Sequence, residues 1–468
     1  MIASLGLFIS RVFRACVPDP FVIAVALTLI TALLALALGD FPSSAGAASI
    51  GPRLVVLLDS WRGAEGLWKF LAFSMQMCLV LVTGHALAEC PVIKRGIGRL
   101  AAVPTTAASA AAMVGFAAAM TALVNWGLGL IVGALLAREV GRSLRARHVP
   151  HHYPLIVAAG YMGLMVWHGG LSGSGPLSMT TIAGASKVLP AEAVNRLGGE
   201  GIPLTQTLFS PMNLVITAGL LVIIPVVLAL AAPRRPGDMR PTPDTIAQPE
   251  PRSPQPREAP TFVDRLETSP VVAWIVGALV AAAIWRFGRV SSLQFIGLDE
   301  INAVMLGLGI VMHGSVRSYL AAAESAVRGC TGIILQFPLY GGIMAMSVAS
   351  GLIGVVARGM AGAADDRMLP ILTFWAACVV NMFVPSGGGQ WGVQGPISLE
   401  AAARAGIAPG TMVMAVAYGD QTTNMLQPFW ALPLLAITGA RARDIVGYTC
   451  LPMVASMIWI SAVMFLMA

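Results

Sequence analysis

The amino-acid sequence predicts an all-α polytopic membrane protein built from two inverted-topology repeats, and three observations lead to this class. Of the 468 residues, 57% are hydrophobic and 11% are charged, which is too little polar surface to coat a water-soluble globule. Apolar runs of about 20 residues recur along the chain, and a helix of this length crosses the hydrocarbon core of a bilayer. Polar and glycine-rich interruptions occur at matching positions in the two halves of the chain.

Each apolar run is expected to contain one helix or more. The runs cover residues 21–39, 66–88, 105–137, 154–186, 207–232, 271–287, 301–313, 329–356, 369–403, 410–439 and 445–467. Arg11 and Arg14 precede the first run, as basic residues precede the apolar part of a signal peptide. That run is about 19 residues long and begins far from the N-terminus, so we expect an uncleaved first span.

Two runs, 105–137 and 369–403, are too long for a single span. The first is interrupted at Asn125-Trp126-Gly127, and the second is interrupted between Asn381 and Trp391, where glycines are dense. Each run is therefore predicted to form a re-entrant helical hairpin, which enters the membrane and turns back.

Two other runs, 154–186 and 410–439, contain stretches that disfavour a continuous helix. The first includes the glycine-rich stretch from Trp167 to Pro176, and the second includes the polar stretch from Asp420 to Pro428. Both predict a broken transmembrane helix. Irregular backbone at membrane depth is tolerated only where it is buried in protein or lines a cavity. The two hairpins and the two breaks therefore predict one central site.

The interruptions indicate an internal duplication. Four pairs of landmarks are separated by nearly the same number of residues: Gln76 and Gln336, Asn125 and Asn381, Tyr161 and Tyr418, and Pro176 and Pro433. We expect an N-terminal repeat over 1–232, and an extra crossing helix followed by a C-terminal repeat over 269–468. The segment 233–268 between them is rich in proline and mixed charge. Such a composition cannot bury a core, so this segment is predicted to be a linker.

Basic residues gather in the loops between the apolar runs, most densely at Arg138, Arg142, Arg145 and Arg147. The positive-inside rule places these loops, the N-terminus and the linker in the cytoplasm. This arrangement requires the first hairpin to enter from the cytoplasm and the second from the outside, with the span near 271–287 inverting the second half. Inverted halves around a site at mid-membrane are typical of secondary transporters that work by alternating access.

Other functional classes lack support in the sequence. The formal net charge of +7 is explained by membrane topology, so we expect no nucleic-acid partner. The six cysteines form no CxxC pair, and the histidines at 148, 151 and 152 have no carboxylate or thiol beside them, so no metal site is predicted. We also find no nucleophile motif or phosphate-binding loop and expect neither an enzyme nor a cofactor. A channel remains an alternative.

Several strings carry a resemblance to a known family. They are Asn125-Trp126-Gly127-Leu128-Gly129, Pro385-Ser386-Gly387-Gly388-Gly389, Trp391 with Gln394-Gly395-Pro396, Gln427 through Pro433, Val17 through Phe21 and Val82 through Ala88. With these strings, the chain resembles the short-chain fatty acid transporter family nearly end to end. The resemblance implies transport of acids such as acetoacetate and butyrate across a bacterial cytoplasmic (inner) membrane.

The same family belongs to a superfamily of ion transporters, which implies a homodimer with a fixed scaffold and a moving transport domain of elevator type. The sequence departs from the family pattern at two places. His168 follows Trp167 where relatives tend to continue with glycine, and Gln390 stands where a histidine is often seen. Both departures affect where a titratable histidine for proton coupling would lie.

A monocarboxylate needs hydrogen-bond donors for its oxygens and an apolar wall for its tail. Helix N-termini at the hairpin tips and breaks offer N–H groups for this purpose. The predicted substrate-binding residues are Asn125, Trp126, Gly127, Ser172, Gly173, Ser174, Asn381, Ser386, Gly387, Gly388, Gly389, Thr422, Thr423, Asn424 and Gln427. The alternatives are that the glycines only allow close helix packing and that the tryptophans anchor the protein at the membrane surface.

Three ionisable side chains are candidates for ion coupling, namely Asp420, His168 and His85. Such groups at membrane depth are costly and often mark ion pathways, although a structural role for the histidines is the alternative. The sequence favours symport with H⁺ over Na⁺. A Na⁺-coupled dicarboxylate carrier and an anion channel remain alternatives. Because no Lys or Arg occupies the breaks, a monoacid is the preferred substrate.

Overall fold

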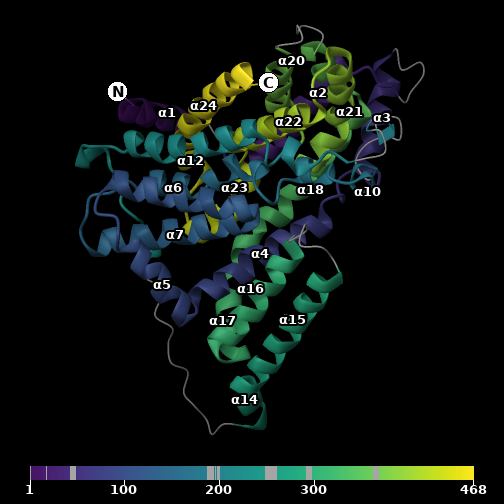
Figure 1. The fold of residues 1–468 in the computed structure, drawn as a ribbon. Helices are drawn as coiled ribbons and strands as arrows, with labels where there is room; N and C mark the ends of the chain where they lie inside the picture. The colour runs from purple at the N-terminus through teal and green to yellow at the C-terminus, as the bar shows by residue number, and fades with distance from the viewer. Residues whose placement is uncertain are drawn as a thin grey trace.

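The computed structural model describes residues 2–16, 18–42, 49–186, 194–195, 197, 201–247, 261–290, 298–361 and 368–467. Within these ranges the chain is helical and contains no strand (Figure 1), which confirms the predicted all-α class. Six helices are long and apolar enough to cross a membrane: α2 (Pro20–Leu38), α4 (Leu71–Glu89), α6 (Ala107–Val124), α12 (Pro211–Ala231), α18 (Thr331–Ala349) with the turn before it, and α24 (Ala442–Met467). The chain is therefore a multi-span membrane protein.

The remaining helices are shorter or more polar. In the N-terminal half they are α1 (Ile2–Cys16), α3 (Ile50–Arg62), α5 (Pro91–Ala101), α7 (Trp126–Ala146), α8 (Tyr153–Gly160), η1 (Met162–Met165), η2 (Trp167–Gly169), α9 (Ser174–Ser178), α10 (Ile182–Ala185) and η3 (Leu204–Gln206). In the remainder they are η4 (Pro236–Asp238), α13 (Asp244–Ala247), α14 (Phe262–Glu267), α15 (Pro270–Val290), α16 (Leu298–His313), α17 (Val316–Val327), η5 (Arg328–Cys330), α19 (Leu352–Ala361), α20 (Leu369–Asn381), α21 (Gly387–Ala405), α22 (Pro409–Thr423), η6 (Asn424–Leu426) and α23 (Pro428–Thr438).

The helices form three connected groups in Figure 1. Helices α6, α7 and α12 lie together, and the terminal helices α1 and α24 pack on each other and on α12. Helix α4 leaves this group and packs with α16 and α17, and α15 packs on α16, so that these helices form a projection at the bottom of the view. Helices α20, α21 and α22 pack together near the C-terminal end of α24.

Both predicted hairpin regions consist of two helices that turn back on each other. Helices α6 and α7 meet at Asn125, whose side-chain oxygen accepts hydrogen bonds from the backbone N–H groups of Gly127 (2.9 Å) and Leu128 (3.2 Å). Helices α20 and α21 are joined by 382–386, and the Ser386 hydroxyl accepts from the N–H of Gly389 (3.2 Å). These caps satisfy N–H groups that the first turn of a helix leaves without a partner.

The two predicted helix breaks lie side by side and complete each other's hydrogen bonding. After α8 the chain passes through η1 and η2, and after α22 it passes through η6. The Tyr161 hydroxyl donates to the carbonyls of Asn424 (2.9 Å) and Gln427 (3.1 Å) in the opposite break. The inverted relationship of the two halves and the elevator scaffold stay predictions.

The linker is docked on the protein in its first part, whereas residues 248–260 lie outside the described residues. Arg240 donates its backbone N–H to His152 Nδ1 (3.1 Å), and its carbonyl accepts from the N–H of Tyr153 (2.8 Å). Thr242 is fully buried and donates its N–H to His151 Nε2 (3.1 Å). We call the segment 239–247 the strap, because main-chain hydrogen bonds hold it across the start of α8.

Two neutral histidines hold the strap. Each accepts a hydrogen bond at a ring nitrogen, which a protonated imidazole cannot do. His151 Nδ1 lies 2.8 Å from the carbonyl of Val149 and is assigned the ring hydrogen, which leaves Nε2 free to accept from Thr242. Burial lowers the pKa of His152 from 6.5 to about 4. Burial also lowers the pKa of His151, and the nearby Arg145 charge adds to this effect.

We expect the strap to detach as the pH falls. A released histidine gains its proton near pH 6.5, but docked His152 gains it only near about 4. The docked state therefore has its full stability above pH 6.5 and loses it progressively below that value. Hydrogen exchange at the Thr242 amide, corrected for the intrinsic pH dependence of exchange, measures this loss.

The control is His148→Asn, which changes an exposed histidine of the same loop. This variant should keep the pH profile of the natural protein, whereas combining His151→Gln with His152→Gln should make amide protection nearly independent of pH. Full protection of Thr242 in the natural protein down to pH 4 would contradict the role of the histidines.

Candidate functional site

A cavity of about 270 Å³ lies where the two hairpin tips meet the first helix break. It brings together six predicted residues, namely Trp126, Ser172, Ser174, Ser386, Gly387 and Gly388. Five further residues complete its lining: Phe70, Phe73, Trp167, Pro385 and Trp430. Some of these residues lie hundreds of positions apart in the sequence, so the cavity exists only because the hairpins and the break converge.

Hydrogen bonds fix the two sides of this cavity. The backbone N–H of Trp126 donates to the Ser172 hydroxyl (2.9 Å), which ties the tip of the first hairpin to the first break. On the other side, Gly387 begins α21 in close contact with that break. A Cβ atom on Gly387 would lie 2.6 Å from both His168 Nε2 and the Ser174 hydroxyl oxygen, so this approach requires glycine.

Aromatic side chains form one wall of the cavity. The rings of Trp126 and Trp430 pack edge to face with centroids 5.2 Å apart, and Phe73 lies 5.8 Å from Trp430. Trp167 lies 6.1 Å from Trp126. These three tryptophans therefore line the cavity. Trp391, in contrast, is buried in another cluster with Met179 and Leu399.

Three buried polar atoms on the lining have no hydrogen-bond partner among the described residues. They are the hydroxyl oxygen of Ser174 and the indole nitrogens of Trp167 and Trp430. A buried donor without a partner costs about 1–3 kcal/mol. All three groups can donate, and no lining side chain is charged. The cavity is therefore suited to a small ligand that has hydrogen-bond acceptors at one end and apolar surface at the other.

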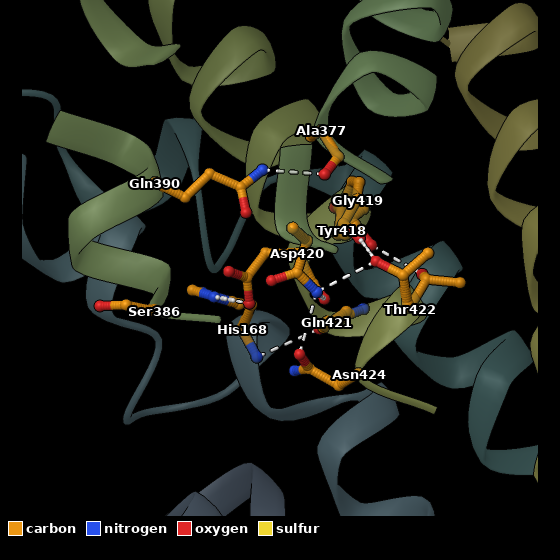
Figure 2. Close-up of polar contacts among 12 residues, drawn as sticks. His168, Ala377, Ser386, Gln390, Tyr418, Gly419, Asp420, Gln421, Thr422 and Asn424 are labelled. Carbon is orange, nitrogen blue, oxygen red and sulfur yellow. Dashed lines mark hydrogen bonds and ion pairs between the residues drawn. The ribbon is translucent and has the colours of Figure 1, made fainter. Parts of the chain in front are cut away.

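A buried histidine and carboxylate lie directly behind this cavity. His168 Nε2 is 3.0 Å from Asp420 Oδ1, and the two residues are 1% and 2% exposed (Figure 2). The backbone N–H of His168 donates to the Gln421 side-chain oxygen (3.1 Å). The second oxygen of Asp420 has no partner among the described residues. Since an isolated buried carboxylate would be very costly, the histidine is the group that makes Asp420 tolerable here.

Five predicted residues form a polar cluster behind the second break and do not line the cavity. The Asn381 amide nitrogen donates to the carbonyl of Asp420 (2.7 Å) and to the side chains of Thr423 and Asn424 (both 3.0 Å). The Gln427 amide donates to the Asn381 carbonyl (2.5 Å). Thr422 also points inward and donates to the carbonyl of Tyr418 (2.6 Å; Figure 2).

The other predicted residues lie beside the cavity or far from it. Asn125, Gly127, Gly173 and Gly389 belong to the caps and turns that shape its edge. His85 is on α4 instead, where its Nδ1 lies 3.5 Å from Arg138 Nη1. Arg138 forms ion pairs with Glu89 (2.9 Å) and Glu139 (3.0 Å), which are also remote from the cavity lining.

Phe70 and Phe73 are lining residues that sequence reasoning did not identify. They lie at the start of the apolar run 66–88, where aromatic side chains are expected for a lipid-facing or buried helix.

Gln390, the second departure from the family pattern, is buried in α21 and donates to the carbonyl of Ala377 (2.9 Å; Figure 2). Its amide therefore has a structural partner and is not on the cavity lining.

Comparison with known proteins gives matches along nearly the whole chain. The family model described as short chain fatty acid transporter matches residues 1–467. Two relatives carry the description "Putative short-chain fatty acid transporter". The protein from Escherichia coli (strain K12) is 36% identical over 450 residues, and that from Haemophilus influenzae (strain ATCC 51907 / DSM 11121 / KW20 / Rd) is 34% identical over 449. Each match covers 96% of both chains.

Two solved structures are similar at low sequence identity. The Alcanivorax borkumensis YdaH transporter has a TM-score of 0.41 and 15% identity, and the match covers 96% of this chain and 98% of that one. Neisseria gonorrhoeae MtrF has a TM-score of 0.39 and 14% identity, with 97% of each chain covered. The family match and the two relatives above are the findings that classify the protein, and on their evidence the chain belongs to the short-chain fatty acid transporter family.

Proposed function

We propose that this chain is a secondary carrier for short-chain monocarboxylates and that the 270 Å³ cavity is its substrate site. The observation that carries the proposal is the set of three unpartnered donors, from Ser174, Trp167 and Trp430, on an uncharged lining. A carboxylate would accept from these groups, and its short alkyl tail would contact Phe73 and Trp126. Membership of the family supports the same substrate class.

The absence of charge on the lining argues for one carboxylate per substrate. Arginine would hold a carboxylate by strong, charge-assisted hydrogen bonds, whereas neutral donors and the N-terminal end of α21 hold it more weakly. A carrier must also release its substrate. The first carboxylate of a diacid would use the three unpartnered donors. Its second carboxylate would face the rings of Phe73 and Trp126, so a dicarboxylate carrier is the less favoured alternative.

H⁺ is the proposed coupling ion, and the pair formed by His168 and Asp420 is its proposed carrier. The pair lies directly behind Gly387 and Ser174, so a bound carboxylate would add negative charge close to it. Added negative charge favours the protonated state of neighbouring groups. Substrate and proton would therefore bind with positive cooperativity, and by reciprocity each would promote binding of the other.

Sodium is less favoured because a side-chain amide fills the polar cluster of the second break. The Asn381 nitrogen lies within 3.0 Å of three oxygen atoms, on Asp420, Thr423 and Asn424. A group of oxygen ligands is what a hard cation requires. These three oxygens already accept hydrogen bonds, whereas Asp420 Oδ2, Asn381 Oδ1 and Gln427 Oε1 have no partner among the described residues. The proposal has several further parts. From the family resemblance, we expect movement of elevator type, a homodimer and an inner-membrane location. From the basic loops, we expect the N-terminus and the linker to lie in the cytoplasm.

Transport of labelled butyrate into proteoliposomes tests the proposed function. We expect accumulation driven by an inward pH gradient, no stimulation by a Na⁺ gradient and no inhibition by succinate. Counterflow of unlabelled butyrate should accelerate uptake, because a carrier exchanges substrate and a channel does not. Uptake driven by Na⁺ and displaced by succinate would instead identify a dicarboxylate carrier, and uptake without counterflow would identify a channel.

Removing one donor from the cavity should weaken substrate binding. Ser174→Ala removes a hydroxyl that lines the cavity and leaves the volume of the site nearly unchanged. We expect KM for butyrate to rise about tenfold, which corresponds to a lost hydrogen bond of about 1.4 kcal/mol. The matched control is Ser178→Ala on the same helix, whose hydroxyl donates to the carbonyl of Gly175 (2.7 Å). Equal KM values in the two variants would exclude Ser174 from the substrate site.

Neutralising the buried pair should separate exchange from accumulation. Asp420→Asn keeps the shape of the side chain, and the Asp420 carbonyl still accepts from Asn381. We expect this variant and His168→Gln to retain butyrate counterflow and to lose accumulation driven by the pH gradient. His85→Gln is the control, since His85 lies beside Arg138 and away from the cavity. Normal proton-driven accumulation in Asp420→Asn would rule out the pair as the coupling site.

A further inference from the structure

A second cavity, of about 480 Å³, lies along α18 and α23 at the end nearest the start of α24. We call it the basic vestibule, and its lining includes Gln336, Leu432, Leu435, Ala436, Arg441 and Arg443. The lining therefore combines two arginines with an amide and several apolar side chains. Neither the substrate cavity nor the family assignment accounts for this feature.

The vestibule leads toward the substrate cavity along two closely packed helices. A Cβ on Gly329, just before α18, would lie 2.7 Å from the Cβ of Ala436. Deeper along the same helices, Phe337 stacks on Phe429 with ring centroids 4.2 Å apart. Phe429 in turn contacts the ring of Trp430 (5.0 Å), which lines the substrate cavity. A layer of aromatic rings thus separates the two cavities.

The two arginines at the mouth make no ion pair with the described acidic side chains. Asp444, the acidic residue next to them in sequence, lies 3.1 Å from Arg240 and 3.9 Å from Arg14. Asp19 also lines the vestibule, but one of its carboxylate oxygens caps α2 by accepting from the N–H of Phe21 (2.9 Å). The lining therefore has two arginines against one carboxylate, and the N-terminal end of α24 adds its dipole to this excess of positive charge.

A buried amide lies in the interior of the vestibule, on the lining. Gln336 is 3% exposed, and its side-chain oxygen has no hydrogen-bond partner among the described residues. An amide side chain carries both donors and an acceptor, so its NH₂ group can donate to a carboxylate, and its oxygen can accept from the hydroxyl of a protonated carboxyl group. Basic residues in loops are expected from membrane topology alone. Topology does not explain an unpartnered buried amide in a cavity that ends at two free arginines.

We propose that the basic vestibule is a second binding station for the small carboxylate on the transport path, on the side of the basic loops. The station rests on the proposed function. The anion would be held at Arg441 and Arg443, with its tail along Leu432 and Ala436, and Gln336 would bind its carboxyl group on the way to the aromatic layer. The station thus collects or releases substrate on that side of the membrane.

Protection of an introduced thiol tests this station in the full-length protein. Ala436→Cys places a thiol on the exposed side of the vestibule, and Ala403→Cys places the control thiol on the exposed face of α21, outside both cavities. Each protein is reacted with an anionic methanethiosulfonate reagent in phosphatidylcholine nanodiscs. At four times its Kd for the station, butyrate should slow labelling at 436 about fivefold, because only unoccupied protein reacts. Labelling at 403 should not change.

Added substitutions separate the station from the substrate cavity. Arg441→Gln with Arg443→Gln, on the Ala436→Cys background, should abolish protection by butyrate. Ser174→Ala on the same background should leave the half-protecting butyrate concentration unchanged. Protection that survives loss of both arginines, or that shifts with Ser174→Ala, would overturn the station, because the thiol would then report binding elsewhere.

Two further outcomes are distinguishable. If Ala436→Cys transports butyrate but shows no protection, the station is refuted and the carrier function stands; protection without any transport refutes the carrier function alone. Nanodiscs that contain phosphatidylglycerol provide the last comparison. If the anionic lipid slows labelling at 436 and butyrate does not, the vestibule is a lipid site and the proposed station is wrong.

Discussion

The hydrogen-bonding requirement of interrupted helices is the constraint on which the rest of this structure depends. A backbone carbonyl or N–H group at membrane depth cannot turn to water and must find a partner in the protein. Here each break supplies the partners of the other: the Tyr161 hydroxyl binds two carbonyls of the second break, and the Gln421 side chain accepts the N–H of His168. The breaks must therefore lie side by side, and the position of the cavity between the hairpin tips follows from this contact.

The polar residues of the central region divide into two groups with different surroundings. Around Asn381 the amides and hydroxyls bind one another and hold the second break in shape, although Asn381 Oδ1, Asn424 Nδ2 and Gln427 Oε1 have no hydrogen-bond partner among the described residues. At the cavity, the Ser174 hydroxyl and the indoles of Trp167 and Trp430 are donors without partners on residues that line the cavity. Gly387 joins the two regions, since its lack of a side chain lets α21 approach both Ser174 and His168. Donors without partners on residues that line the cavity thus accompany a hydrogen-bonded cluster behind it.

Much of the fold could be predicted from the sequence because a polar or glycine-rich stretch in an apolar run has few physical explanations. The caps at Asn125 and Ser386 follow from such stretches. The direction in which a side chain points is harder to predict. Thr422 and Asn424 have the right chemistry for a binding site, but periodicity alone does not show that they point away from the cavity. Phe73 gave no signal because an aromatic residue in an apolar helix is ordinary. The strap could not be predicted because main-chain hydrogen bonds, as at Arg240, leave no mark on composition.

The uncharged lining of the cavity has a consequence for the physiology of a cell that carries this protein. Neutral donors bind an anion weakly, and weak binding allows fast release. A carrier of this kind becomes half-saturated only when its substrate is abundant, on the order of the millimolar range if the net binding free energy is about −4 kcal/mol. Such a carrier would transport rapidly at high substrate concentrations, as in surroundings where fermentation releases large amounts of short acids. It would not be effective at taking up traces of substrate.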